Sequence, residues 1–236
     1  ETYDGVIQVA DSKNLERALT IALQLSEMDV PFVLDLNMED EALNRGIAVD
    51  TEGLSETLGV EVVSTVATRR KGIDSLRRAD FAKTNYSTSL DYGEKIEGAV
   101  ARVLPLLPQT KISRRSIALM LLSGDRSLFQ WLGDRMAAAD LEKINTIRRE
   151  VEGQFTEPVG YILNRKRLKV AQDVMALNVQ RVEVKQKSLS RFLGNVSMHP
   201  VYGIPFVLAI LYLTYLFVGV LGAGTFVNFL ESVVFG

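Results

Sequence analysis

The first 81 residues alternate short apolar runs with segments whose apolar residues recur at helical spacing. Three apolar runs indicate β-strands, over residues 5–10, 32–36 and 60–66. Helical patterns follow them, over residues 14–28, 51–58 and 73–81, and a shorter helix is expected after Asp40. Strands that alternate with helices in this way predict a parallel sheet with right-handed crossovers.

The pattern changes after a polar stretch at residues 82–90, which we interpret as a linker. Beyond it no further strand pattern is recognised, and apolar positions at helical spacing predict an all-helical domain over residues 91–186. Pro105 is expected to kink or end its first helix. Ser113 is expected to cap the next one, and Pro158 to start the last, with Leu177 facing the core.

The C-terminal part is apolar enough for a membrane span. Residues 200–230 contain no charged side chain, and residues 201–221 are almost wholly apolar. About 20 apolar residues cross a bilayer as a helix, so we predict a transmembrane helix and a following turn over residues 200–236. A buried core helix is the alternative, which so long a run disfavours. An amphipathic segment at 187–199 is expected on the membrane surface.

Basic residues outnumber acidic ones just before this span, which by the positive-inside rule places residues 1–199 in the cytoplasm.

The composition of the chain mainly excludes classes of function. With 27 basic and 29 acidic residues the net charge is −2, which gives no indication of nucleic-acid binding. The chain has no cysteine, and its single histidine, His199, disfavours a histidine metal site or a catalytic triad. We therefore predict no metal site within this chain.

The chemistry that remains centres on the string Asn37-Met38-Glu39-Asp40, directly after the second predicted strand. A carboxylate at Asp40 can accept from both the ring N–H and the exocyclic amine of guanine, a donor pair that adenine lacks. Asn37 can hold the neighbouring loop and the base edge. The alternative is an Asx turn that caps the next helix.

A second loop favours the nucleotide interpretation. Ala67 and Thr68 follow the third predicted strand, and a backbone N–H there can donate to the guanine carbonyl oxygen. Ligands of open α/β sheets bind at the carboxyl ends of the strands. Two strand-end loops that both suit one base are more specific than either loop alone.

The phosphate half of such a site is not recognised. The string G-x-x-x-x-G-K-[ST], which cradles phosphates, does not occur in the sequence. The string from Asp50 to Gly53 matches the D-x-x-G magnesium switch, but it follows the guanine string instead of preceding it, so we interpret Asp50 as a helix cap. No residue is assigned to phosphate or Mg²⁺, and no catalytic residue is predicted.

Taken together, these segments resemble the FeoB-type ferrous-iron transporters of bacteria. The resemblance is carried by VIQVADSKNLERAL at residues 6–19, LNMEDEA at 36–42, VATR at 66–69, GIDSL at 72–76 and HPxxGIP at 199–205. It is dense over residues 3–78 and 198–221, and only architectural across the helical middle.

The resemblance implies a partial Ras-like α/β sheet with helices, then an all-helical regulatory domain and the first transmembrane helix. The segments would be the C-terminal part of a G domain (1–81), a linker (82–90), the helical domain (91–186), an interfacial segment (187–199) and the span (200–236). It implies GTP or GDP as the cofactor, read by Asn37, Met38, Asp40, Ala67 and Thr68. Mg²⁺ is expected in the full-length protein, with its ligands outside this chain.

The function expected from the resemblance is part of a GTP-binding transporter for ferrous iron in the inner (plasma) membrane. Its partners would be the guanine nucleotide, the bilayer, the remaining half of the G domain and further membrane helices, with ferrous iron carried by the full protein. The polypeptide is therefore interpreted as a fragment or a gene piece. The rival hypothesis is a membrane-tethered interaction module whose GTPase-like fold has degenerated and does not hydrolyse nucleotide.

Overall fold

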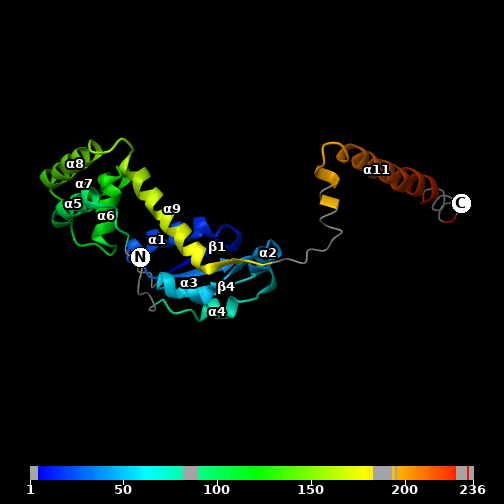
Figure 1. The fold of residues 1–236 in the computed structure, drawn as a ribbon, viewed down its shortest axis with the longest axis horizontal. Coiled ribbons are helices and arrows are strands. Elements are labelled where there is room, and N and C mark those ends of the chain that lie inside the picture. The colour runs from blue at the N-terminus through cyan, green and yellow to red at the C-terminus, as the bar shows by residue number, and fades with distance from the viewer. Residues whose placement is uncertain (1–4, 82–89, 183–192, 195, 227–232, 234–236) are drawn as a thin grey trace. The chain divides into compact units, whose positions relative to one another are not determined.

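The computed structural model describes residues 5–81, 90–182, 193–194, 196–226 and 233 (Figure 1). The chain forms two compact units, residues 1–184 and residues 185–236. The predicted linker at 82–90 lies outside the described residues except for Leu90, as do residues 187–192 and 195 of the predicted interfacial segment.

A three-stranded parallel sheet forms the centre of the first unit, as the alternating pattern predicts. Its strand order is β1-β2-β4, with bounds β1 (Val6–Asp11), β2 (Phe32–Asn37) and β4 (Val62–Ser64). The register pairs Val6 with Phe32 and Leu34 with Val62. All five residues before Asn37 on β2 are buried, which explains why this strand reads as one continuous apolar run apart from Asp35.

The helices of this part connect the strands: α1 (Leu15–Glu27), α2 (Glu39–Asn44), α3 (Thr51–Leu58) and α4 (Ile73–Arg77). A 3₁₀ turn, Ser12–Asn14, precedes α1. Three predicted bounds need correction. Helix α2 begins before Asp40, which therefore lies in its first turn, and α4 ends at Arg77 instead of continuing to residue 81. Strand β4 covers only residues 62–64 of the predicted 60–66.

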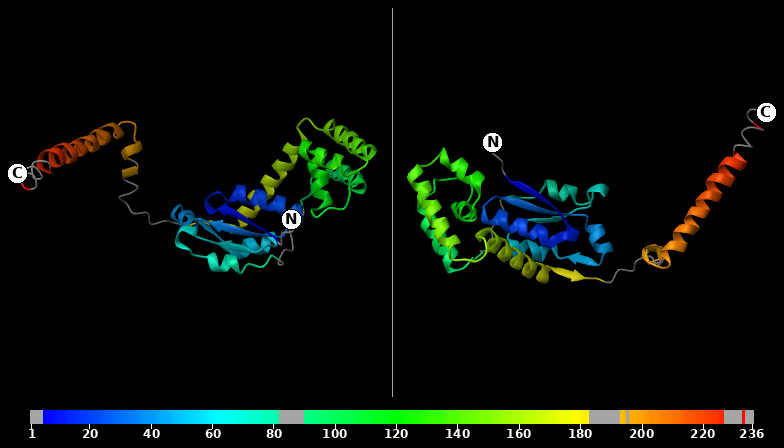
Figure 2. Two further views of the ribbon diagram at one scale, coloured as in Figure 1. Left: turned by 180° about the vertical axis from the view of Figure 1, so that it is seen from behind. Right: turned by 90° about the horizontal axis from the view of Figure 1, so that it is seen from above.

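A second, two-stranded sheet was not predicted. Strand β3 (Ile47–Val49) pairs antiparallel with β5 (Val179–Arg181), so the expectation of no strand beyond the linker is wrong. Each strand has three residues, too few for a period-two pattern to stand out. The pairing brings the chain after the last long helix back beside the segment that follows α2 (Figure 2).

The rest of the first unit is helical, as predicted, with α5 (Glu94–Val103), α6 (Arg114–Leu122), α7 (Arg126–Gly133), α8 (Ala138–Glu152) and α9 (Val159–Asn178). Pro105 lies in a 3₁₀ turn that ends α5. Ser113 occupies the N-cap of α6 but makes no side-chain cap bond, and Leu177 is 78% exposed. The N-cap position of Ser113 is therefore as expected, without a side-chain bond, whereas the expectation that Leu177 faces the core is wrong.

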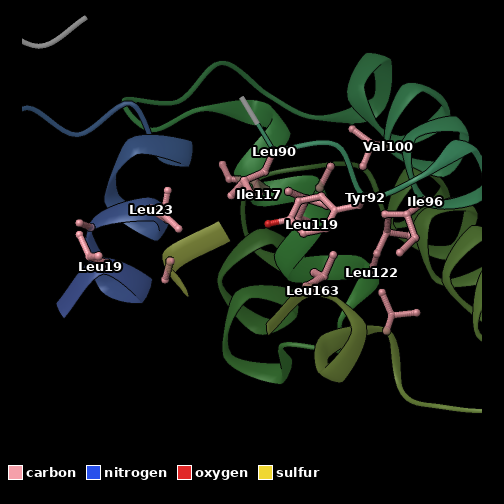
Figure 3. Close-up of a cluster of buried hydrophobic side chains, with 14 of the residues drawn as sticks. Leu19, Leu23, Leu90, Tyr92, Ile96, Val100, Ile117, Leu119, Leu122 and Leu163 are labelled. Carbon is pink, nitrogen blue, oxygen red and sulfur yellow. The ribbon is translucent and has the colours of Figure 1, made fainter. Parts of the chain in front are cut away.

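One continuous apolar core runs from the sheet into the helices. Helix α9 packs along α1 (Figure 1). Figure 3 shows Leu19 and Leu23 of α1 on one side of the cluster and Ile117 and Leu119 of α6 on the other. Helix α1 therefore belongs to the core of the sheet and to that of the helical part.

A buried carboxylate reinforces this junction. Glu27, at the end of α1, has a side chain that is only 4% exposed. Its Oε2 accepts from Arg167 Nε of α9 at 2.8 Å, and its Oε1 accepts from the Tyr92 hydroxyl at 2.7 Å. Arg115 Nη1 of α6 lies 3.4 Å from Oε1. The ionised acid is thus paired with two cations from the helical part, as a buried charge requires.

The second unit contains an apolar helix, α11 (Gly203–Tyr215), which continues as a π-helix, Leu216–Phe226. Eighteen residues of it, Gly203–Val220, are long and apolar enough to cross a membrane, and only 6% of them are buried within the protein. Before it, His199 Nδ1 accepts from the backbone N–H groups of Val201 and Tyr202, both at 3.2 Å. His199 thus orders the turn that leads into this helix.

Candidate functional site

The carboxyl ends of the three parallel strands meet at one edge of the sheet. The register places Asp11 opposite Asn37, and Leu36 opposite Ser64. The loops after the strands therefore lie together, at the position where open α/β sheets bind ligands.

The Asn37 side chain joins the loop after β2 to the loop after β4. Its Oδ1 accepts from the backbone N–H of Ala67 at 3.2 Å and from that of Met38 at 2.8 Å. Its main-chain carbonyl accepts from the Ser12 hydroxyl at 2.7 Å, which attaches the loop after β1 as well. Asn37 therefore holds three strand-end loops together.

This arrangement differs from a simple helix cap. The N-cap of α2 is Met38, which has a left-handed backbone (φ 63°) and makes no side-chain cap bond. Such a backbone is uncommon for a residue other than glycine. It turns the chain sharply between the Asn37 side chain and the first turn of α2. Met38 itself is 40% exposed and lies 3.4 Å from Lys13 Nζ through its sulfur.

Asp40 presents a partly exposed carboxylate at the start of α2. Its Oδ1 accepts from the backbone N–H of Glu41 at 3.0 Å, and its Oδ2 lies 3.4 Å from Arg69 Nη1. The Asp40 side chain is 28% exposed and that of Arg69 is 73% exposed. An exposed pair of this kind is weak, so a ligand with N–H donors can replace the guanidinium at little cost.

Two further ion pairs surround this carboxylate. Lys71 Nζ contacts Glu39 at 2.5 Å, and Lys13 Nζ pairs with Glu41 and, at 3.7 Å, with Asp11. The acids of the first turn of α2 are thus each matched by a cation from a neighbouring loop. Acidic residues at a helix N-terminus also interact favourably with the helix dipole.

Ala67 and Thr68 lie on a 3₁₀ turn, Ala67–Arg69, and both are exposed. The structure brings the Ala67 N–H to Asn37, while Thr68 follows on the outer side of the same turn. Gly72, which ends this loop, has φ +78° and approaches the sheet closely. A Cβ on it would lie 2.2 Å from the Ser64 carbonyl oxygen, so only glycine fits there.

Five residues with contacts at this edge were not predicted: Ser12, Lys13, Asp35, Thr65 and Arg69. Thr65 is fully buried, and its hydroxyl donates to Asp35 Oδ1 at 2.7 Å. Burial raises the pKa of the Asp35 carboxyl, and the hydrogen bond from Thr65 partly offsets that rise. A signal was available in the sequence, because an acid two residues before Asn37 interrupts an otherwise apolar strand.

Asp50 caps α3 as expected, since its Oδ1 accepts from the Gly53 N–H at 3.0 Å. Among the described residues, no three histidine or acidic side chains lie close enough together to hold a metal ion.

Comparison with known proteins identifies the family. Residues 1–79 match the family model of ferrous iron transport protein B, and residues 92–180 match that of the FeoB cytosolic helical domain. The two matches follow one another in the chain and together include the sheet and all five helices α5 to α9. The chain belongs to the FeoB family.

Curated FeoB relatives align with most of this chain. The Fe(2+) transporter FeoB of Salmonella typhimurium is 28% identical over 224 residues, which cover 90% of this chain and 27% of the relative. That of Escherichia coli is 37% identical over 127 residues, 52% of this chain and 16% of the relative. The chain thus spans about a quarter of the length of the Salmonella relative.

Solved FeoB structures share the fold. A mutant of S. thermophilus NFeoB bound to GDP superposes with a TM-score of 0.64 at 27% identity, covering 75% of this chain and 69% of that chain. The apo cytosolic domain of T. maritima FeoB superposes with a TM-score of 0.59 at 25% identity, covering 76% and 69%. These neighbours confirm a partial Ras-like parallel sheet with helices, followed by a helical domain.

Proposed function

We propose that this chain carries the guanine-reading part of a FeoB nucleotide site, together with the helical domain and one membrane helix of a ferrous-iron transporter. The observation that carries the proposal is the hydrogen bond from the Ala67 N–H to Asn37 Oδ1. It joins the loop after β2 to the loop after β4 beside Asp40, and we call these two the base-reading loops. The GDP bound by the NFeoB relative supports the same assignment.

The residues present suit guanine. Asp40 offers a carboxylate for the ring N–H and the exocyclic amine, once Arg69 moves aside. The Ala67 N–H is held by Asn37 Oδ1, so the next N–H of the same turn, that of Thr68, offers the donor for the guanine carbonyl oxygen. Met38 borders the same loops. Adenine presents neither the donor pair nor that carbonyl, so the site would reject it. The free energy of binding GTP or GDP would stabilise the arrangement of these loops that contacts the base.

The remaining parts of the proposal concern the whole protein. We assign Gly203–Val220 to a membrane span, with the G domain and the helical domain on the cytoplasmic side. The amphipathic segment at 187–199 would lie at the membrane surface. Phosphate and Mg²⁺ binding, the passage of ferrous iron and any hydrolysis of GTP would depend on segments besides those described here.

Nucleotide competition in the full-length protein tests the assignment. The protein is purified in detergent and loaded with a fluorescent GDP analogue, which is then displaced with GDP or ADP. We expect GDP to compete at least about 100-fold better than ADP, since the lost Asp40 contacts leave a polar group unpaired. Equal competition by the two nucleotides would contradict the proposed function.

A further inference from the structure

Asp35 is a buried acid for which base recognition as described above has no role. It is 4% exposed and lies on β2, two residues before Asn37. Side chains alternate along a strand, so Asp35 and Asn37 project from the same face of the sheet. Its carboxylate Oδ1 accepts from the Thr65 hydroxyl at 2.7 Å.

Thr65 in turn lies between the two base-reading loops. Its backbone N–H donates to the Leu36 carbonyl at 2.9 Å, and its own carbonyl accepts from the Glu39 N–H at 3.3 Å. Its hydroxyl oxygen lies 3.4 Å from Asn37 Oδ1. A change in the orientation of this hydroxyl therefore changes the hydrogen bonding at Asn37 Oδ1.

The Thr65 hydroxyl has one proton and two acceptors within reach, Asp35 Oδ1 and Asn37 Oδ1. The hydrogen bond to Asp35 is much the shorter of the two, 2.7 Å against 3.4 Å. The proton therefore goes to Asp35. Asn37 Oδ1 is then left to the N–H groups of Ala67 and Met38.

We propose that Asp35 is a positioning residue of the guanine site, which holds the Thr65 proton away from Asn37 and so keeps Asn37 Oδ1 for the Ala67 N–H. This inference rests on the proposed function. Without Asp35 the Thr65 hydroxyl turns to Asn37 Oδ1 and competes with Ala67 for it, which loosens the loop after β4. Asp35 acts through Thr65 and Asn37 and does not touch the base.

If this is correct, replacing Asp35 with an apolar residue does not lower thermal stability but does lower nucleotide affinity. A buried carboxylate is costly to ionise, and the rise in the pKa of Asp35 reflects that cost. Replacing it with valine, which suits a strand, removes the cost. Asp35→Val is therefore expected to unfold at a temperature equal to or above that of the wild type, while binding nucleotide more weakly.

The test measures GDP and IDP affinity in the full-length protein by displacement of a fluorescent GDP analogue. IDP lacks the exocyclic amine that Asp40 would read, so the GDP-to-IDP ratio reports on Asp40 alone. We expect Asp35→Val to weaken the binding of both nucleotides about tenfold, the size of one hydrogen bond, with the GDP-to-IDP ratio unchanged. Asp35→Asn keeps an acceptor for Thr65 and is expected to bind within about threefold of the wild type.

A double variant separates positioning from structural support. In Asp35→Val with Thr65→Val no hydroxyl remains to compete at Asn37 Oδ1, so affinity recovers toward that of the wild type. If the double variant binds more weakly than Asp35→Val alone, the role is structural and the inference is wrong. Wild-type affinity in Asp35→Val also overturns it, and leaves the proposed function standing. If the wild type shows no preference for GDP over ADP, the proposed function itself fails.

Discussion

The side-chain oxygen of Asn37 accepts a hydrogen bond from the backbone N–H of Ala67 at 3.2 Å, across 30 residues of sequence. These two residues belong to different strand-end loops, and the bond fixes the distance between them. The turn whose next N–H, that of Thr68, would face the guanine carbonyl is therefore positioned by Asn37, which opens the N-x-x-D string.

Removing this bond should release the loop after β4. In Asn37→Ala we expect faster hydrogen–deuterium exchange over residues 66–71 and nucleotide affinity lowered about tenfold, because the one hydrogen bond that joins this loop to the Asn37 side chain is lost. Asn145→Ala is the matched control, since Asn145 also accepts a side-chain hydrogen bond, from Arg148 on α8. Equal exchange over residues 66–71 in the two variants would count against the role given to Asn37.

The close approach of Gly72 to the sheet gives a second prediction. Gly72→Ala and Gly124→Ala both place a side chain at positive φ, which costs about 1 kcal/mol or more. Only at Gly72 would the new Cβ also meet backbone, 2.2 Å from the Ser64 carbonyl oxygen, whereas at Gly124 the nearest atom outside its chain neighbours is Arg148 Nη1, at 4.0 Å. Gly72→Ala should therefore reduce the free energy of unfolding further, and should weaken nucleotide binding. Urea unfolding measures the free energy of unfolding of both variants. Similar reductions in the two would contradict the clash at Gly72.

The buried Glu27 gives a third prediction, on the junction between α1 and the helical domain. Glu27→Gln removes the charge opposite Arg115 and Arg167, and unpairing buried charges costs about 3 kcal/mol. Glu150→Gln is the control, because its pair with Arg102 is about half exposed and should contribute about 0.5 kcal/mol. Thermal and urea unfolding measure both. A loss in Glu27→Gln no larger than that of the control would show that this cluster does not stabilise the junction.

The Asp35 carboxyl gives a pH-dependent prediction. Its pKa in the folded chain is raised above the ordinary value of 3.8. Between 3.8 and the folded value the unfolded chain releases this proton while the folded chain keeps it, so stability falls as the pH rises through that window. Above the pKa of Asp35 in the folded chain, the loss of stability is complete.

The measurement compares the free energy of unfolding of the wild type with that of Asp35→Asn from pH 4 to pH 8. The difference between them should shift in favour of Asp35→Asn as the pH rises, because asparagine does not titrate. A difference that is independent of pH would contradict the raised pKa.

Much of the fold followed from local pattern. The strands β1 and β2, the helix α1 and the parallel order were predictable, because each buries a face whose period is visible in the sequence. The β3–β5 pair was not, because each strand has three residues and the pairing joins Val49 to Val179, 130 residues apart in the sequence. No local signal specifies such a contact.

The candidate site divides in the same way. Asn37, Asp40 and Ala67 were found by residue type and spacing, and the structure brings their loops together. Thr65 and Asp35 were missed because their importance depends on register: β2 and β4 must align for the hydroxyl to reach the carboxylate. Arg69 was missed because its contact with Asp40 is made across two loops.

Asp40 tests the central claim most directly. A carboxylate accepts from the exocyclic amine of guanine, whereas the amide of asparagine can donate to the carbonyl that xanthine carries at the same position. In the full-length protein, Asp40→Asn should lower GDP affinity at least about tenfold and raise XDP affinity, so that the preference shifts toward XDP. An unchanged preference for GDP over XDP in a folded Asp40→Asn protein would contradict the assignment of this loop to guanine.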